Sequence, residues 1–196
     1  MVFYPPSARA VDTEVARDIL REVNWHPFVT PVGLFVNQTP TEIVKVASSL
    51  RLNVVQLHGD EGEGYLEDMP ELSIIKAIKA DPATLGDKLI EWDESVCAFH
   101  LSNLVAILLD SPGPEAGGTG IENNWKLIEE ILRADKTGMN IILAGGLTPE
   151  NVGDVVRRIR PYAVDVSSGI EESKGKKSVE KMRRFVNAVR EADASP

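Results

Sequence analysis

Cysteine is nearly absent from this sequence: Cys97 is the only one among 196 residues. One cysteine cannot form an internal disulfide, and it cannot supply the cysteine-rich ligand sets of structural zinc sites. No run of about 18 apolar residues is present, so the sequence offers no membrane-spanning helix. The first residues lack the basic segment and apolar core of a secretory signal peptide, and the expected location is the cytoplasm.

Positive charge is scarce as well. Lys and Arg number 21 against 30 Asp and Glu, so the formal net charge is −9. No basic stripe interleaved with aromatic residues occurs, which argues against nucleic acid as a partner. An acidic protein can still bind an anionic small molecule locally, through backbone N–H groups at a helix start and one or two cations. We therefore expect a small-molecule ligand, with neither nucleic acid nor a membrane as a partner.

Hydrophobic residues make up 43% of the sequence, which suits a single domain, 1–196, with a sizeable core. Short apolar runs alternate with longer amphipathic stretches, and no linker interrupts the alternation. Continuously apolar strands separated by helices predict a parallel sheet covered by helices. The expected strands are 31–36, 54–57, 74–78, 105–109, 141–144 and 163–166, and the expected helices begin at Pro40, at Asp81 (ending at Trp92), ahead of Trp125 and after Thr148.

Two α/β architectures fit this order, a (β/α)₈ barrel and an open doubly wound sheet. Both place functional residues at the carboxyl ends of their strands, so polar residues there do not separate them. The G-x-G-x-x-G signature is absent, which lowers the dinucleotide-binding version of the open sheet. The last two strands each end in a glycine-containing loop, and in barrels that pair of loops is the common phosphate site.

The two late loops carry the clearest chemical signal. Gly145 and Gly146 let backbone N–H groups approach a ligand with no Cβ in the way. Ser167, Ser168 and Gly169 offer hydroxyls and N–H groups at the end of the neighbouring strand. One glycine pair alone would indicate only a tight turn, whereas two such loops on consecutive strands predict a cradle for a phosphate dianion.

Four other side chains are candidates for chemistry or packing. Asp110 ends an apolar run, so its carboxyl can act as a general acid if it is desolvated, or cap nearby loop N–H groups. His58 ends its strand and is a candidate acid, base or phosphate donor, or a side chain that only binds a loop. If Val2-Phe3-Tyr4 ends a strand, Arg9 can grip a carboxylate through its planar fork; otherwise it is a solvated arginine. Cys97 is expected to be a small buried side chain.

Six segments follow one another in a recognisable order: 2–9, 32–37, 55–61, 108–111 together with 117–120, 144–152 and 164–171. They include Gln-Leu-His-Gly-Asp-Glu at 56–61 and Asp-Val-Ser-Ser-Gly at 165–169. In this order the segments resemble the phosphoribosylanthranilate isomerase family, and among barrels the two motifs are specific to it. The Gly- and Pro-rich segment 111–120 is expected to form a flexible cover.

The resemblance implies a (β/α)₈ TIM barrel of the phosphate-binding type and an Amadori rearrangement in tryptophan biosynthesis. The ribose ring of N-(5-phosphoribosyl)anthranilate opens, and the resulting imine isomerises to 1-(2-carboxyphenylamino)-1-deoxyribulose 5-phosphate. The resemblance implies no cofactor and no metal. The chemistry needs an acid for the ring oxygen and a base for the adjacent carbon.

The resemblance also assigns residues. It implies Asp110 as the acid and Arg9 near the anthranilate carboxylate, with His58 and Asp165 as further substrate-binding residues. The residues implied in phosphate binding are Gly145, Gly146, Ser167, Ser168 and Gly169.

Two departures from the family pattern stand out. The family's base is a cysteine in a Lys-Ile-Cys-Gly run that ends the first strand, and no such run exists here. By this alignment the chain begins within the second strand, so the first βα unit, about 30 residues, is missing. Cys97 cannot stand in for the base, because it precedes the sixth strand. We therefore expect low stability or self-association through an open barrel edge. The second departure is minor: Asn123-Asn124-Trp125 stands where the family has Phe-Asp-Trp.

Two alternatives remain open. The first is another phosphosugar isomerase or synthase barrel. The indole-forming relatives need a lysine in an acid–base pair at the strand ends, and Lys76, inside a strand run and without an evident partner, argues against them. The second is a non-catalytic or impaired phosphosugar-binding remnant, which would keep the phosphate loops and tolerate replacement of Asp110.

Overall fold

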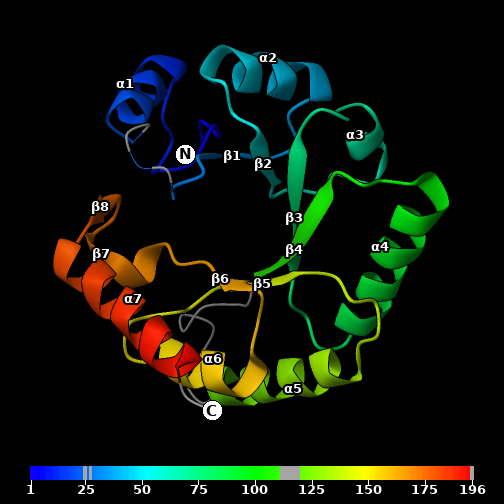
Figure 1. The fold of residues 1–196 in the computed structure, drawn as a ribbon, viewed down its shortest axis with the longest axis vertical. Coiled ribbons are helices and arrows are strands. Elements are labelled where there is room, and N and C mark those ends of the chain that lie inside the picture. The colour runs from blue at the N-terminus through cyan, green and yellow to red at the C-terminus, as the bar shows by residue number, and fades with distance from the viewer. Residues whose placement is uncertain (24–25, 27, 111–119, 195–196) are drawn as a thin grey trace. The chain divides into compact units, whose positions relative to one another are not determined.

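The computed structural model of the chain describes residues 1–23, 26, 28–110 and 120–194 (Figure 1). They form two compact units, one of Met1–Ala77 with Glu94–Ala106 and one of Ile78–Asp93 with Ile107–Pro196. Strands and helices alternate along the chain. The elements are α1 (Thr13–Val23), β1 (Val32–Phe35), α2 (Pro40–Leu50), β2 (Val54–Leu57), α3 (Gly64–Glu67), β3 (Ser73–Lys79), α4 (Leu85–Phe99), β4 (Leu104–Asp110), α5 (Gly120–Ala134), β5 (Ile141–Ala144), α6 (Val152–Ile159), β6 (Ala163–Val164), the 3₁₀ turn η2 (Ser168–Ile170), β7 (Glu171–Ser173), β8 (Lys176–Lys177) and α7 (Val179–Asp193).

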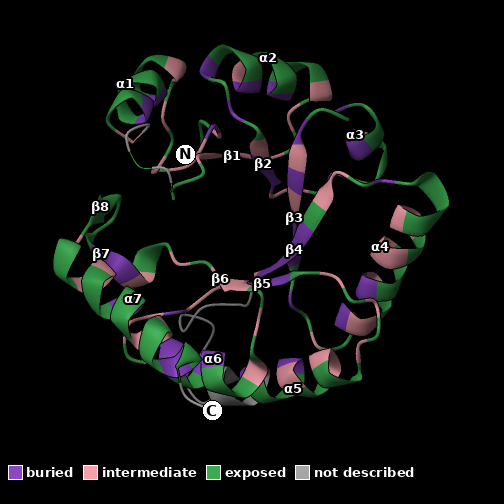
Figure 2. Cartoon of the chain, in the orientation of Figure 1, coloured by how far each residue is buried: buried purple, intermediate pink, exposed green. Residues whose placement is uncertain are grey.

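In the first unit, β1, β2 and β3 form parallel pairs. Val54 is in register with Val32 on one side and with Ser73 on the other. The apolar side chains of these strands build the core of the unit, where Val55, Leu57 and Ile74 are fully buried (Figure 2). The prediction of a parallel sheet of apolar strands is confirmed for this part of the chain.

The first residues of the chain lie along β1. The N–H of Phe3 donates to the carbonyl of Leu34 at 2.8 Å, and the N–H of Leu34 donates to the carbonyl of Met1 at 2.8 Å. Val2 forms isolated parallel bridges to Leu34 and to Ala10. The pairing is too short to make a named strand, but residues 2–4 do run parallel to β1 as a strand end would.

Helix α2 begins as its sequence predicts. The side chain of Thr39 accepts the N–H of Glu42, the carboxylate of Glu42 reaches back to the N–H of Thr39, and Pro40 occupies the first turn. The helix ends at Arg51, whose left-handed φ of 55° stops the helical hydrogen-bonding pattern. Its buried residues, Ile43, Ala47 and Leu50, are three or four residues apart and so share one face.

The second unit pairs the latter half of β4 with β5, and β5 with β6, all parallel. Leu109 is in register with Leu143, which is in register with Val164. All four residues of β5 are buried. Strand β6 ends at Val164, two residues short of the predicted strand 163–166, although the N–H of Asp165 still donates to the carbonyl of Leu143 at 2.8 Å.

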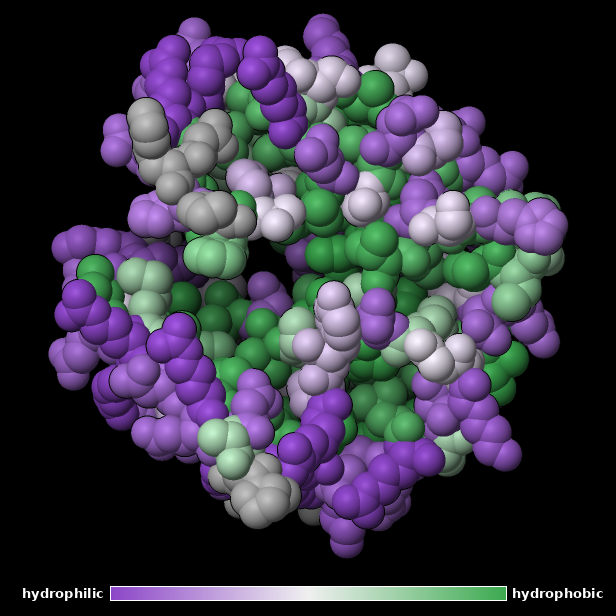
Figure 3. All heavy atoms as spheres, viewed as in Figure 1, coloured by the Kyte–Doolittle hydropathy of each residue, from purple (hydrophilic) through white to green (hydrophobic). Residues whose placement is uncertain are grey.

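Helices α5, α6 and α7 belong to this unit, and α6 packs against both α5 and α7. Within α7, Phe185 and Ala192 are buried, and much of the surface around this helix is hydrophilic (Figure 3). Helix α6 starts at Val152, later than the predicted cap at Thr148. Thr148 nevertheless behaves like a cap, because its Oγ1 accepts the N–H of Glu150 and its carbonyl accepts the N–H of Val152.

Helix α4 differs most from expectation. It runs from Leu85 to Phe99, whereas the predicted helix spans 81–92. Its buried residues are Leu85 and Leu89, one turn apart, while Cys97 is exposed. The prediction that Cys97 is buried was wrong, because the helix continues through that segment and turns the thiol away from the face that carries the two leucines.

Candidate functional site

The carboxyl ends of β4, β5 and β6 lie side by side. Asp110 is in register with Ala144, and Asp165 directly follows Val164, the last residue of β6. Neighbouring strands are about 4.8 Å apart, so Asp110 and the loops after β5 and β6 meet at one edge of the sheet. Parallel α/β proteins bind their ligands at this edge.

The loop after β5 depends on two glycines. Gly145 and Gly146 have φ values of 83° and 65°, a region that residues with a Cβ rarely adopt. Asn151 holds this loop from the start of α6: its Nδ2 donates to the carbonyl of Gly146 at 2.9 Å, and its Oδ1 accepts the N–H of Thr148 at 2.8 Å. The backbone of the loop is therefore fixed by a single side chain.

The loop after β6 touches the loop after β5. A Cβ added to Gly169 would lie 1.9 Å from the carbonyl oxygen of Leu147 and 3.0 Å from its carbonyl carbon. Real Cβ atoms do not approach an oxygen so closely, so this contact requires glycine. The sequence predicted that the two loops are neighbours, and the structure confirms it.

Backbone donors are available at this contact. Among the described residues, no acceptor is found for the N–H groups of Gly146 and Gly169. Backbone N–H groups of glycine-containing turns are the kind of donor that binds an anion. The two loops therefore present backbone donors near the strand that carries Asp110.

Sequence reasoning missed Lys177 near this site. Its Nζ donates to the carbonyl of Ser167 at 2.8 Å and to the carboxylate of Glu171 at 3.0 Å. Glu171 is buried, although buried carboxylates are rare unless paired. A glutamate close behind a serine-glycine loop and a lysine six residues later was the signal available in the sequence.

Asp110 is half-buried at the end of β4. Its carbonyl accepts the N–H of Ala80 at 3.0 Å, which ties the end of β4 to the chain that leaves β3. The predicted flexible cover, 111–120, lies outside the described residues except for Gly120, which opens α5.

His58 and Arg9 belong to the first unit. His58 follows β2 directly, and its Nδ1 lies 2.8 Å from Nε2 of Gln56. With the amide donating, Nδ1 is the acceptor in this contact. Arg9 follows the segment paired with β1, and its N–H donates to Oγ of Ser7 at 3.1 Å. The structure thus brings Asp110, Asp165 and the two loops together in one unit, with His58 and Arg9 at strand ends of the other.

The first unit also contains a buried ion pair. Nζ of Lys76 lies 2.6 Å from Oε2 of Glu61, and the two side chains are only 4% and 0% exposed. Lys76 also donates to the carbonyl of Gly59 at 2.7 Å, and Glu61 accepts the N–H groups of Asn37 and Gly59 at 2.8 Å each. The interpretation that Lys76 has no partner was wrong, because its partner follows the preceding strand.

Burial by itself raises the pKa of Glu61. The hydrogen bond from Lys76, the N–H of Asn37 and the charge of the lysine outweigh it, so the pKa lies below its ordinary value. The carboxylate thereby joins the loop after β1 to the loop after β2. The Glu61 carboxylate positions the loop that begins at His58. Lys76 is buried against this carboxylate and so has no exposed acid–base role.

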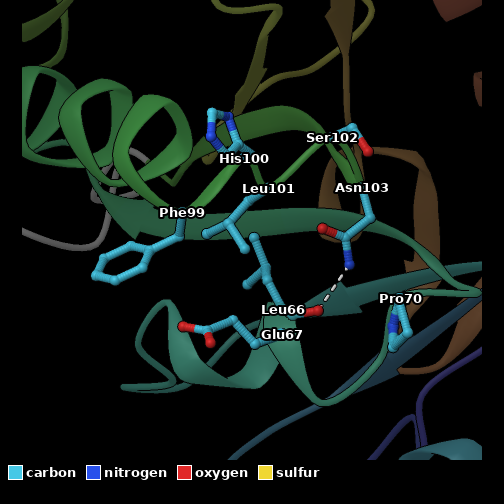
Figure 4. Close-up of a pocket in the computed structure, with 8 residues that line it drawn as sticks. All are labelled: Leu66, Glu67, Pro70, Phe99, His100, Leu101, Ser102 and Asn103. Carbon is cyan, nitrogen blue, oxygen red and sulfur yellow. Dashed lines mark hydrogen bonds between the residues drawn. The ribbon is translucent and has the colours of Figure 1, made fainter.

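A separate pocket of about 280 Å³ lies at the other ends of the strands, among residues that precede β3 and β4 (Figure 4). The side chain of Asn103 spans it, with Nδ2 donating to the carbonyls of Leu66 at 2.9 Å and Met69 at 3.1 Å. None of the predicted site residues lines this pocket. The side-chain amide of Asn103 is engaged in holding the chain around α3, and we assign the pocket no role in binding.

In the part of the chain that the structure describes, no three His, Cys, Asp or Glu side chains are grouped so as to hold a metal ion. The helices of that part are all too short or too polar to cross a membrane.

A parallel α/β fold with a carboxylate and two glycine-containing loops at adjoining strand ends fits the TIM-barrel class. Comparison with known proteins makes the assignment specific. The family model for N-(5'-phosphoribosyl)anthranilate (PRA) isomerase matches residues 1–188. The chain belongs to the phosphoribosylanthranilate isomerase family.

Individual relatives agree. The N-(5'-phosphoribosyl)anthranilate isomerase of Trichlorobacter lovleyi is 40% identical over 192 residues, which cover 97% of this chain and 86% of the relative. That of Moorella thermoacetica is 43% identical over 188 residues, covering 95% and 77%.

Solved structures agree as well. The phosphoribosyl anthranilate isomerase of Thermotoga maritima matches with a TM-score of 0.80 and 37% identity, covering 97% of this chain and 86% of the other. A phosphoribosyl anthranilate isomerase in complex with reduced 1-(o-carboxyphenylamino)-1-deoxyribulose 5-phosphate matches with a TM-score of 0.78 and 34% identity, with the same coverage. A third, at 31% identity and a TM-score of 0.73 and covering 97% and 85%, consists of monomers generated from the dimeric T. maritima enzyme.

Proposed function

We propose that this chain catalyses the isomerisation of N-(5-phosphoribosyl)anthranilate to 1-(2-carboxyphenylamino)-1-deoxyribulose 5-phosphate, in the cytoplasm and without a cofactor. Family membership over residues 1–188 carries the proposal. The relative that binds a reduced form of this product supports the choice of ligand. The strand ends that gather Asp110 and the two loops support the choice of site.

In the proposed reaction, the phosphate rests on backbone N–H groups of the loops that contain Gly146 and Gly169, while Arg9 holds the anthranilate carboxylate. Asp110 gives its proton to the ring oxygen as the bond from that oxygen to C1 breaks, leaving a protonated imine and the Asp110 carboxylate. A base then takes the proton from C2, and the resulting enolamine tautomerises to the ketone. The family resemblance also assigns substrate binding to Asp165, which follows β6, and to His58, which follows β2.

The base has no counterpart in this sequence. The sole cysteine, Cys97, is exposed on α4, and no cysteine ends a strand. This observation favours a second candidate function, binding of the phosphosugar without turnover. For the fold, we propose that residues 1–196 belong to one isomerase-like domain of the (β/α)₈ barrel type. In support, the segment aligned with the family's second strand runs parallel to β1.

The activity test compares three purified proteins: the parent chain, Asp110→Asn and the control Asp154→Asn. Asp154 lies on α6, where its side chain is 74% exposed and pairs with Arg157. We expect Asp110→Asn to lower kcat by about 100-fold or more, since a general acid contributes on that order, and Asp154→Asn to match the parent. Turnover by Asp110→Asn equal to the parent would remove Asp110 from the mechanism. Substrate binding without turnover by the parent itself would favour the second candidate.

A further inference from the structure

Lys177 is fixed against the loop after β6. Its Nζ donates to the carbonyl of Ser167 at 2.8 Å and also lies 3.4 Å from Oγ of the same serine. The remaining contact is with the carboxylate of Glu171 at 3.0 Å. The ammonium thus bridges the loop to a buried acid on the hairpin of β7 and β8, where Lys177 and Glu171 face each other in register.

The carbonyl of Ser167 and the N–H of Ser168 belong to the same peptide group. In a planar trans peptide these two groups point in opposite directions. A cation bound to the carbonyl therefore turns the N–H of Ser168 to the other side and polarises it as a donor. Asn151 acts in the same way on the loop after β5, where its Nδ2 binds the carbonyl of Gly146.

The hairpin that carries Lys177 is itself anchored. Nζ of Lys181 donates to the carbonyl of Glu171 at 2.7 Å, and the N–H of Ser178 donates to the carbonyl of Ile170 at 2.8 Å. The side chain of Glu171 is only 6% exposed, so its charge is offset by the lysine beside it. Lys177 is consequently held in one place, unlike its neighbour Lys176, which is 74% exposed and pairs with Glu172 on the surface.

We propose that Lys177 is a positioning residue for phosphate binding. It acts through the carbonyl of Ser167, orienting the N–H of Ser168 toward the phosphate of the substrate, and Glu171 holds it there. The inference rests on the proposed function, because it assigns a further residue to the phosphate loops of that site.

The experiment measures binding of inorganic phosphate by calorimetry and steady-state kinetics of the full chain. The variants are Lys177→Met and, as a matched control, Lys176→Met on the same hairpin. We expect Lys177→Met to weaken phosphate binding and to raise KM by about tenfold, as for loss of one well-made hydrogen bond to a charged group, with kcat within about twofold of the parent. Lys177→Arg keeps a cation and a donor and is expected to restore most of the affinity.

The outcomes separate the two proposals. Phosphate affinity of Lys177→Met equal to that of Lys176→Met overturns the role of Lys177 while leaving the phosphate site intact. Failure of the parent to bind inorganic phosphate contradicts the phosphate site itself. If Lys177→Met does not fold, Lys177→Gln replaces it: its shorter neutral side chain cannot bridge Ser167 and Glu171, so affinity at least about threefold weaker is expected. Unchanged affinity in that variant also overturns the proposal.

Discussion

At Gly169 the backbone passes so close to Leu147 that a single methyl group changes the site. We expect Gly169→Ala to lower the free energy of unfolding by about 1–3 kcal/mol and to weaken substrate binding, because the Cβ must push the two loops apart. Thermal unfolding and KM measure the two effects.

Gly86 provides the control for that change. It lies in α4, and a Cβ there meets no atom within 4 Å. Gly86→Ala is therefore expected to leave KM unchanged and to stabilise the helix by roughly 0.5–1 kcal/mol. Equal stability of Gly169→Ala and the parent would contradict the close approach of the two loops.

Single residues differ in how well the sequence predicts them. The glycines at 145, 146 and 169 were predictable as loop residues, because the sequence shows them close behind apolar runs. A glycine there lets the backbone approach a ligand or another loop without a Cβ in the way. Lys177 was not, since its role depends on a hairpin that brings it back to Ser167. Cys97 was misplaced, because a helix boundary decided its exposure.

The ion pair of Lys76 and Glu61 acts at the scale of whole elements, since it joins the ends of β1 and β2 to the body of β3. We expect Glu61→Gln to lower the free energy of unfolding by about 3–5 kcal/mol at neutral pH, because it leaves the lysine buried without its partner. Denaturant unfolding measures this, with Glu91→Gln on the exposed side of α4 as the control. An effect no larger than that of the control would mean that the pair contributes little.

The same pair gives a pH dependence with a definite sign. The pKa of Glu61 is lower in the folded chain than the value of about 4.3 for an unfolded glutamate, so its contribution is fully present above that value. It is lost as the pH falls through the folded pKa. The stability difference between the parent and Glu61→Gln should therefore shrink as the pH is lowered from 6 toward about 3. A difference that stays constant over this range would contradict the lowered pKa.

The elements themselves were largely predictable. Strands β2 and β5 have the bounds that their apolar runs predict, and α2 starts at the predicted proline. Errors lie at boundaries: α4 begins and ends late, and β6 stops early. In these places hydrogen bonding outside the segment decides the bounds. The pairing of Lys76 with Glu61 joins two elements and could not be read from either run alone.

For the whole molecule, we predict self-association through the strand edge at Val2. Among the described residues, isolated bridges pair Val2 with Leu34 and with Ala10, and a sheet edge with so little regular pairing invites pairing with a second copy. Sedimentation at increasing concentration is expected to show a growing fraction of dimer or larger species. A single monomeric species throughout the range, stable to heating, would contradict this.

Asn151 supports its loop with both atoms of one amide, and this makes the protein sensitive to ageing. Hydrolysis of that amide to an acid would keep the oxygen that faces the N–H of Thr148 and would replace the donor to Gly146 with a second oxygen. Two oxygens would then repel each other across a distance that now holds a hydrogen bond. Protein in which this amide has been hydrolysed is therefore expected to bind phosphate more weakly than fresh protein.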